Sequence, residues 1–490
     1  MTGLPGRIGD VLAVDPAANA IEYDGQWRTW GEVAGTVDQV TSLVTPGTEV
    51  GILLRNNPAS VGLLLGVLRA GAGVVTINPG RGLDRTREDI AALDLPVLAG
   101  SPLDLAELVP VGGRATTVAV DDLGEPFAVT RGSADAAADP SADTAVRMLT
   151  SGTTGPPKRV DLSYETLERV LVGAKHYESN RETTLRLRAG VAVVNSPLVH
   201  LGGLFRVLQC VTDGRSFCLL DRFTVDGWVD AVRRHRPATA SLVPTALRMV
   251  LEADVDPDDL SSLRSVISGT APLDPVDAEA FTDRFGVPVL VSYAATEFGG
   301  GVAGWNLEDH RAFWATKRGS VGRAHAGCQL RVVDPASGDP LPPDGEGLLE
   351  VKAGQLADDT WVRTTDLARI DADGFVWILG RADQAIIRGG FKVRPEDIRA
   401  ALERHPAVRG AALVSQDDRR LGAVPVAAVE LRADAEPVGP DDLLAYAGTV
   451  LARYELPAAI RVVDELPRTD SGKVDLVAVG LLLDGAVAGS

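Results

Sequence analysis

Residues 150–158 are the part of the sequence best suited to hold a phosphate group. They read TSGTTGPPK and combine four hydroxyl side chains, two glycines and a lysine. Glycines let the backbone approach phosphate oxygens, hydroxyls and amides donate hydrogen bonds, and lysine supplies positive charge. The GxxxxGKS/T pattern of a Walker loop is absent from this segment. The segment therefore predicts an anion-binding loop of another kind, although a solvated turn can have the same composition.

A second segment, residues 291–297, reads VSYAATE and follows an apolar run. In α/β enzymes, the carboxyl ends of sheet strands carry groups that contact ligands. Glu297 can offer a hard oxygen to a magnesium ion on ATP phosphates, and Tyr293 can stack on a purine. Taken alone, a glutamate at a strand end is more often a solvated loop residue.

Asp366 and Arg381 lie on either side of a predicted hairpin, which turns at residues 371–374. Because the hairpin folds back on itself, the two side chains should meet at its open end. A carboxylate beside a guanidinium can grip the two hydroxyls of a ribose. A plain salt bridge has the same two groups, so the pattern alone does not separate these alternatives.

Lys473 ends a fourth segment, residues 467–473, which reads PRTDSGK. A lysine on a loop flanked by glycine and serine can swing into a cleft and neutralise developing negative charge. A single lysine near the end of a chain more usually faces solvent.

The elements that must position these segments follow from the hydrophobic pattern. Short apolar stretches alternate with longer amphipathic ones, which predicts βα units around a largely parallel sheet. The stretches are residues 50–54, 73–77, 191–194, 240–243 and 288–292. After residue 380 the pattern predicts helices from Pro395 and over 441–453, and strands near 408–414, 424–431 and 460–463.

A chain of 490 residues is too long for one hydrophobic core. We expect an α/β fold with a large N-terminal domain, residues 1–381, of mixed and parallel sheets layered with helices. Residues 382–490 should form a small, mobile α+β C-terminal lid domain. The Asp- and Ala-rich stretch 133–143 is expected to be an exposed linker.

The composition excludes several classes of protein. A formal net charge of −19 argues against a nucleic-acid binder, and no apolar run is long enough for membrane insertion. The N-terminus lacks the apolar run of a signal peptide. The three cysteines (Cys210, Cys218 and Cys328) form no CxxC pair and have no histidine at metal-ligand spacing, which favours reduced thiols and a cytoplasmic location.

Together and in this order, the four segments resemble the adenylate-forming superfamily, which includes acyl- and aryl-CoA synthetases, adenylation domains of peptide synthetases and firefly luciferase. The resemblance covers nearly the whole chain, from RTWGE at residues 28–32 and LRAGAG at 68–73 to Lys473. It implies an enzyme that uses ATP and magnesium to form an acyl-adenylate and then transfers the acyl group to a thiol. The sequence departs from the usual pattern at Ala294 and Thr365, which stand where glycine is common.

The resemblance also assigns roles to individual residues. Lys473 would bridge the attacking carboxylate and the α-phosphate, Asp383 would be the hinge of the lid domain, and Glu297 and Thr153 would hold magnesium. The residues expected at the reacting atoms are Lys473, Glu297, Thr296 and His200. Those expected to bind ATP or CoA are Thr150, Ser151, Gly152, Thr153, Thr154, Lys158, Ser268, Gly269, Thr270, Ala271, Tyr293, Asp366, Arg381, Gly389 and Gly390. Those expected to line the acid pocket are His200, Gly202, Gly203, Ala294, Ala295, Gly299 and Gly300.

The thiol and the acid are less closely defined. Gly389 and Gly390 resemble the glycine pair of CoA ligases, which lets pantetheine pass, so CoA is expected, with a carrier protein as the alternative acceptor. The glycines at 202–203 and 299–301 would leave room for a bulky acid, although tight backbone packing explains them equally well. The overall pattern resembles aryl-acid ligases of actinobacterial secondary metabolism, which implies a benzoate- or naphthoate-type acid.

Other functions on the same fold stay open at this point. A fatty acyl-CoA ligase, a stand-alone enzyme that loads a carrier protein, and a catalytically silent nucleotide-binding homologue share the pattern. The intact Lys473 and Glu297 count against the silent homologue, and a luciferase-like oxygenase has no feature of its own in favour. The sequence also leaves open whether the chain forms a homodimer.

Overall fold

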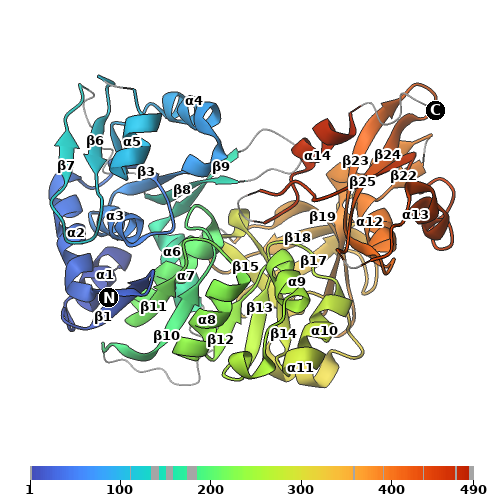
Figure 1. Ribbon diagram of the computed structural model, residues 1–490, viewed down its shortest axis with the longest axis horizontal. Coiled ribbons are helices and arrows are strands. Elements are labelled where there is room, and N and C mark those ends of the chain that lie inside the picture. The colour runs from blue at the N-terminus through green and yellow to red at the C-terminus, as the bar shows by residue number, and fades with distance from the viewer. Residues whose placement is uncertain are drawn as a thin grey trace. The chain divides into compact units, whose positions relative to one another are not determined.

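The structure, a computed structural model, describes residues 3–110, 112–133, 143–150, 158–173, 185–356, 359–389, 391–433, 435–469 and 472–484. These residues form two compact units. The first unit takes residues up to 329 together with 353–360, and the second takes 330–352 and the residues from 361 onward. Both units are built from helices packed on sheets (Figure 1).

The described part of the first unit contains three sheets. A seven-stranded sheet has the order β7 (Ala128–Thr130), β6 (Thr116–Ala119), β5 (Val97–Gly100), β3 (Glu49–Leu53), β4 (Gly73–Ile77), β8 (Thr144–Thr150) and β9 (Lys158–Ser163). A four-stranded sheet has the order β10 (Arg188–Val194), β11 (Arg215–Leu219), β1 (Asn19–Tyr23) and β2 (Gln26–Thr29). A five-stranded sheet has the order β12 (Thr239–Ser241), β13 (Ser265–Ser268), β14 (Val289–Ala295), β15 (Gly300–Gly304) and β16 (Arg323–Ala324).

Helices cover these sheets in the order that the βα pattern predicts. They are α1 (Leu4–Leu12), α2 (Trp30–Leu43), α3 (Pro58–Arg69), α4 (Leu83–Leu93), α5 (Pro102–Leu108), α6 (Tyr164–Gly173), α7 (Leu201–Thr212), α8 (Val225–His235), α9 (Pro244–Glu252), α10 (Pro275–Phe285) and α11 (Leu307–Phe313). Short 3-10 turns are η1 (Pro79–Arg81), η3 (Pro257–Leu260) and η4 (Thr296–Phe298).

The central strands β3, β4 and β5 of the seven-stranded sheet are largely apolar and are buried on both faces. Alternate residues of a strand point to opposite faces, so one strand can serve two cores. Val50 and Ile52 of β3 belong to the core that includes α3, whereas Leu53 packs in the second core with α4 and α5. The central strands of this sheet pair in parallel, and β9 closes it as an antiparallel edge strand.

Two of the sequence motifs that carry the family resemblance have structural roles. In RTWGE, the Thr29 side chain accepts from the Glu32 amide, and the Glu32 carboxylate accepts from the Thr29 amide at 2.6 Å. This capping box satisfies the first free amides of α2. In LRAGAG, Gly71 takes a φ of 72° between α3 and β4, a conformation that glycine adopts without strain. Both motifs therefore build the scaffold rather than the site.

The second unit has two sheets in its described part. One has the order β17 (Gln329–Val333), β18 (Glu346–Lys352), β19 (Val362–Ile370) and β20 (Val376–Arg381). The other has the order β22 (Phe391–Val393), β21 (Ile386–Arg388), β24 (Gly422–Leu431) and β23 (Val408–Asp418), with β25 (Ala459–Val463) beside β24. The helical elements are η5 (Ala382–Gln384), α12 (Pro395–Glu403), α13 (Pro440–Ala447) and α14 (Leu476–Leu483).

Strand β24 separates the two apolar cores of this unit. Ala427 and Val429 face the core that contains α12 and α13, and Val426 and Ala428 face the core that contains α14. The alternation follows from the strand period of two residues.

The predicted fold class is confirmed, with a large N-terminal and a small C-terminal domain of mixed α and β structure. The predicted helix over residues 441–453 is too long, because α13 ends at Ala447, where Gly448 follows. Residues 134–142 of the predicted linker lie outside the described residues. The domain boundary between residues 381 and 382 and the mobility of the lid stay predictions.

Candidate active site

The carboxyl ends of β13 and β14 bring two of the predicted segments together. The strands are parallel, and Ser268 at the end of β13 is paired with Val291 near the end of β14. Both segments therefore leave the sheet at the same edge. Gly269 lies so close to β14 that a Cβ there would be 3.0 Å from the Ser292 carbonyl oxygen. The structure therefore places residues 268–271 beside residues 293–297.

Two features of residues 268–271 indicate a ligand-binding loop. The Ser268 hydroxyl is fully buried and has no hydrogen-bond partner among the described residues. A buried hydroxyl without a partner costs free energy, which a bound ligand would recover. Thr270 has a φ of 70°, which is strained for a β-branched residue. Backbone strain of this kind is concentrated at functional sites.

Tyr293 lies near the end of β14, and Glu297 lies in the short turn η4 that follows the strand. The β14–β15 ladder shifts register between Tyr293 and Ala294, and such bulges re-aim side chains next to active sites. The Tyr293 ring lies 6.3 Å from that of Phe298, which is buried. Glu297 lies in η4 with its carboxylate exposed, so its oxygens are available to a cation.

His200 is the residue that precedes α7, and its backbone is fixed both by a turn and by the first turn of the helix. Its amide donates to the Pro197 carbonyl at 3.0 Å, and its own carbonyl accepts from Gly203 and Leu204. A Cβ at Gly203 would be 2.3 Å from the Pro197 carbonyl oxygen. The turn therefore requires glycine at position 203.

Asn56 holds the same turn from a distant part of the chain. Its side-chain nitrogen donates to the Ser196 and Leu220 carbonyls at 3.1 Å, and its oxygen accepts from the Leu198 amide at 2.8 Å. Asn56 is 6% exposed, so these bonds are made in a protected environment. It positions the segment that leads to His200.

The glycines predicted to line the acid pocket do not all face space. Gly299 has a φ of 70°, and a Cβ there would be 2.8 Å from the Thr166 methyl group of α6. A Cβ at Gly301 would be 3.1 Å from the imidazole of His325. For Gly203, Gly299 and Gly301, tight packing therefore accounts for the glycine. A Cβ at Gly202, in contrast, would meet no described atom within 4 Å.

His325 occupies the room that two glycines of β15 leave. A Cβ at Gly304 would be 2.5 Å from its Nε2, and its imidazole bonds to the Gly301 backbone. Burial lowers the pKa of His325, so its imidazole is neutral at physiological pH. The space beside β15 is therefore filled by a neutral aromatic ring.

The predicted phosphate loop can be described only at its ends. Thr150 and Lys158 are direct partners in the antiparallel ladder of β8 and β9. Ser151, Gly152, Thr153 and Thr154 lie outside the described residues. Ser163 accepts from the Thr166 amide at 3.0 Å and so caps the start of α6, the helix that follows β9.

In the second unit, the β19–β20 hairpin brings Asp366 directly opposite Arg381, as the sequence predicts. The Arg381 guanidinium donates to two side chains, those of Thr365 and Asp383. Its Nη2 donates to Thr365 Oγ1 at 2.8 Å and to Asp383 Oδ2 at 2.7 Å, and its Nε donates to Asp383 Oδ1 at 3.0 Å. The guanidinium is thus held at the open end of the hairpin.

The segment before Lys473 forms a tight turn. The Thr469 amide donates to the Lys473 carbonyl at 2.7 Å, and Gly472 takes a φ of 77°. Arg468 and Val474 pair as an isolated bridge beneath this turn. The backbone position of Lys473 is therefore fixed although its side chain is long.

A buried carboxylate anchors the same segment. Glu430 of β24 is 1% exposed and accepts from Arg409 at 2.6 Å, from the Leu466 amide at 3.1 Å and from Arg468 at 3.3 Å. Both oxygens are bonded, so the cost of burying the charge is offset. Glu430 therefore ties the segment that leads to Lys473 to the core of the unit.

Gly389 follows β21 with a φ of 57°, and its amide donates to the Leu421 carbonyl at 2.7 Å. A Cβ there would be 3.2 Å from the Leu421 side chain. Gly390, its predicted partner, lies outside the described residues.

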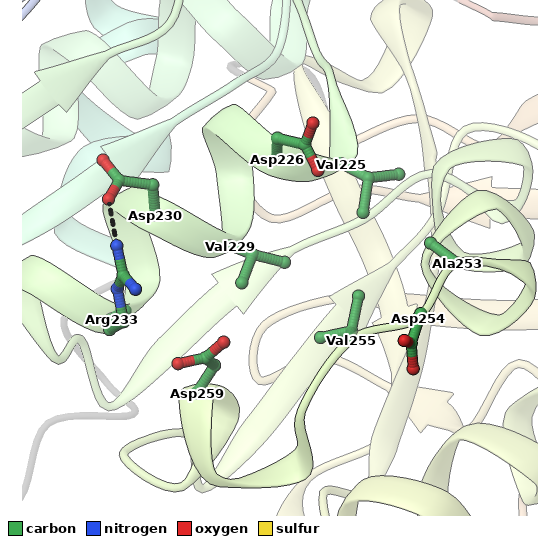
Figure 2. A pocket seen from close by; sticks show the side chains of 9 residues that line it. All are labelled: Val225, Asp226, Val229, Asp230, Arg233, Ala253, Asp254, Val255 and Asp259. Carbon is green, nitrogen blue, oxygen red and sulfur yellow. Dashed lines mark hydrogen bonds and ion pairs between the residues drawn. The ribbon is translucent and has the colours of Figure 1, made fainter.

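A pocket elsewhere in the first unit has no predicted site residue in its lining (Figure 2). Its volume is about 390 Å³, and α8 and residues 253–259 form its walls. Four aspartates surround a valine floor, and one of them, Asp230, pairs with Arg233 and Arg234. Nothing in this pocket resembles a nucleotide or acid site.

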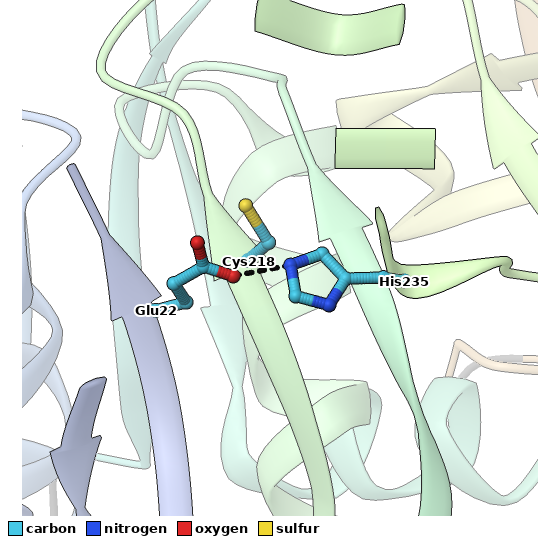
Figure 3. Close-up of side chains that lie close together, drawn as sticks. All are labelled: Glu22, Cys218 and His235. Carbon is cyan, nitrogen blue, oxygen red and sulfur yellow. Dashed lines mark ion pairs between the residues drawn. The ribbon is translucent and has the colours of Figure 1, made fainter. Parts of the chain in front are cut away.

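Glu22, Cys218 and His235 form a buried cluster with the ligand types of a metal site (Figure 3). The sequence did not predict this cluster, because its members are far apart along the chain. The Glu22 carboxylate is already paired with the His235 imidazole and with Arg234, whose Nη1 is 2.5 Å from Oε1. The positive charge of Arg234 would repel a metal ion at this position. The cluster is therefore explained as an internal ion pair and not as a metal site.

Burial raises the pKa of all three cysteine thiols. The pKa of Cys218 rises to about 11, and those of Cys210 and Cys328 are raised above the ordinary value. Cys210 and Cys218 are buried, and Cys328 is partly so. All three are free thiols, as the sequence predicts.

Comparison with known proteins shows to which family of proteins the chain belongs. The family model for the AMP-binding enzyme matches residues 10–358, and the model for the AMP-binding enzyme C-terminal domain matches residues 397–473. The chain therefore belongs to the AMP-binding enzyme family. The resemblance expected from the four motifs is confirmed.

Particular relatives narrow the class. A feruloyl-CoA synthase from Amycolatopsis is 30% identical over 94% of this chain and 95% of that one. ATP-bound MatB from Rhodopseudomonas palustris superposes with a TM-score of 0.84 at 25% identity, covering 99% of each chain. The o-succinylbenzoate CoA synthetase from Bacillus subtilis, solved with its acyl-adenylate, has a TM-score of 0.80 at 25% identity over 98% of each chain. The chain is an AMP-forming acid–thiol ligase that uses ATP to join a carboxylic acid to CoA.

The sequence missed four residues that the structure brings to these segments. Asn56, His325, Thr365 and Glu430 carry no motif of their own, and their partners lie far away or on a neighbouring strand. Only Thr365 left a signal, because it stands where glycine is expected. Among the described residues, no helix is long and apolar enough to cross a membrane.

Proposed function

We propose that the ligase acts on a bulky aromatic acid and that the predicted residues carry its two half-reactions. In the first, the acid's carboxylate attacks the α-phosphorus of ATP, the bond to the pyrophosphate leaving group breaks, and an acyl-adenylate forms. In the second, the CoA sulfur attacks the acyl carbon, the bond to AMP breaks, and the thiol proton is released. Both steps depend mainly on positioning and on neutralising charge.

The observation that carries this assignment is the pairing of Asp366 with Arg381. A carboxylate and a guanidinium at one hairpin end can accept from and donate to the two ribose hydroxyls of ATP. Tyr293 and residues 268–271 would hold the adenine, and the buried Ser268 hydroxyl offers one unused hydrogen bond. Thr150 and Lys158 hold the ends of the phosphate segment in one ladder pair.

Lys473 would neutralise the charge that develops between the carboxylate and the α-phosphate. Its turn fixes the backbone, and its side chain supplies the reach. The lid, residues 382–490, would then rotate about Asp383 so that Gly389 and Gly390 border the pantetheine arm. Glycine at 389 agrees with the positive φ and the close Leu421 side chain.

Magnesium fits the donor set that the structure presents. The exposed Glu297 carboxylate is a hard oxygen ligand of the kind that magnesium prefers, and Thr296 precedes it in η4. Thr153, the other proposed ligand, lies outside the described residues. When bound, the ion would offset the negative charge of the ATP phosphates. The cytoplasmic location and the homodimer stay predictions.

The preference for an aromatic acid is supported by the names of the relatives and by one glycine. Ferulate and o-succinylbenzoate, the acids in those names, are both aromatic. Gly202 is the predicted pocket glycine that faces open space, and it lies two residues after His200. We propose that this position, rather than Gly299, admits the ring of the acid.

A Gly202→Leu substitution tests the pocket. We expect wild-type enzyme to prefer naphthoate- or benzoate-type acids to acetate and propionate, since burying each added ring carbon contributes about 0.8 kcal/mol. The leucine should lower kcat/KM for the bulky acids by about 10- to 100-fold through overpacking, with little effect on acetate. Leucine is also a better helix former than glycine, so α7 should remain stable. Thioester formation by mass spectrometry measures both values.

The matched control is Gly203→Leu, which should unfold the Pro197–His200 turn and abolish activity with every acid. A wild-type preference for acetate in competition would contradict the aromatic acid. Equal losses for large and small acids in Gly202→Leu would show that this position does not select the acid.

A further inference from the structure

The Arg381 guanidinium is bonded by side chains from two different elements. Asp383 accepts from Nε and Nη2 at 3.0 and 2.7 Å, and Thr365 accepts from Nη2 at 2.8 Å. Asp383 lies in η5, two residues beyond Arg381, and Thr365 lies in β19 next to Asp366. One acceptor therefore lies at the proposed hinge itself, and the other lies in the strand β19 that precedes it.

The two acceptors respond differently to a rotation about Asp383. A change of the backbone angles at Asp383 would carry its carboxylate away from Arg381. Thr365 would stay, because β19 and β20 are joined by a ladder that includes the Asp366–Arg381 pair. Thr365 is thus the acceptor that the lid movement leaves in place.

We propose that Thr365 is a positioning residue that holds the Arg381 guanidinium in reach of the nucleotide ribose through both half-reactions. This inference rests on the ribose role proposed above for Arg381. The threonine hydroxyl accepts from the same nitrogen as Asp383 and limits the rotation of the long arginine side chain. A less mobile guanidinium loses less conformational entropy when it binds the ribose.

The role of the Thr365 hydroxyl can be tested separately from that of its methyl group. Thr365 is exposed and belongs to neither core of its unit, so its methyl group contributes little packing. Valine keeps the β-branched shape that suits a strand and removes the hydroxyl. Serine keeps the hydroxyl and removes the methyl group. Thr365→Val and Thr365→Ser are therefore a matched pair.

The test measures adenylate formation by the full-length enzyme with ATP, 2′-deoxy-ATP and 3′-deoxy-ATP at saturating acid. We expect Thr365→Val to raise KM for ATP about threefold to tenfold, the effect of one typical hydrogen bond at an exposed position, with a smaller change in kcat. Thr365→Ser should behave as wild type. One of the two deoxynucleotides lacks the ribose hydroxyl that Arg381 binds. With that nucleotide, Thr365→Val and wild type should have the same KM. The KM values for acid and CoA should not change.

An equal rise in KM for ATP and for both deoxynucleotides in Thr365→Val would overturn the inference, because a merely structural defect affects all three nucleotides alike. A serine variant as impaired as the valine variant would do the same. If wild type fails to distinguish ATP from either deoxynucleotide, the ribose role of Arg381 fails, and the inference falls with it. Should valine lower the melting temperature, Thr365→Ala carries the same comparison.

Discussion

Replacement of Lys473 by alanine is expected to slow adenylate formation by about 100- to 1000-fold, the cost of removing one charge-stabilising group from a transition state. Transfer of the acyl group from supplied acyl-adenylate to CoA should stay nearly intact, because the lysine is needed only before the lid rotates. The turn formed by Thr469 and Gly472 does not depend on the lysine side chain, so the fold should persist. Single-turnover assays of the two half-reactions measure the difference.

Lys473→Arg provides the control, because it keeps the charge on a bulkier group and should retain part of the adenylation rate. If both half-reactions fell by the same factor in Lys473→Ala, the assigned role would be wrong. A melting temperature equal to that of the wild type excludes unfolding as the cause.

Substitution of Glu430 by alanine should have the largest effect on stability. It removes the shared acceptor of Arg409, Arg468 and the Leu466 amide from a site that is 1% exposed. Removal of one partner of a buried ion pair costs about 3–5 kcal/mol. We also expect adenylation to fall, because the segment before Lys473 loses its anchor. Urea unfolding of the full chain measures the change in free energy.

The matched control is Glu436→Ala, which removes the same side chain from an exposed position and should change stability by less than about 0.5 kcal/mol. Glu430→Gln should fall between the two, since the amide oxygen can still accept one hydrogen bond. An alanine variant as stable as wild type would show that the three donors find other partners.

The parts of the site that the sequence predicts are those built by local structure. The hairpin between Asp366 and Arg381 has a short turn with Gly374 at a φ of 82°, so its register follows from a few adjacent residues. The positions of Ser268 and Tyr293 near the carboxyl ends of β13 and β14 follow from apolar runs in the same way. In each case the chain between the paired groups is short, so the pattern fixes the geometry.

The parts that the sequence could not predict depend on distant packing. Whether Gly299 lines a pocket or packs tightly is decided by Thr166, and for Gly301 by His325. Asn56 holds the turn before His200 across 142 residues of sequence. The Arg381–Asp383 bond joins neighbours in sequence, but it depends on the direction that η5 gives the aspartate. Spacing along the chain contains none of this information.

The buried cysteines have a practical consequence for an enzyme whose co-substrate is itself a thiol. With their pKa values raised, Cys210, Cys218 and Cys328 present very little nucleophilic sulfur at neutral pH. An activated acyl group or an oxidised CoA molecule therefore meets little competing protein thiolate. The same protection allows the free CoA that remains in samples withdrawn from the reaction to be titrated with a chromogenic disulfide reagent, with little background signal from the native enzyme.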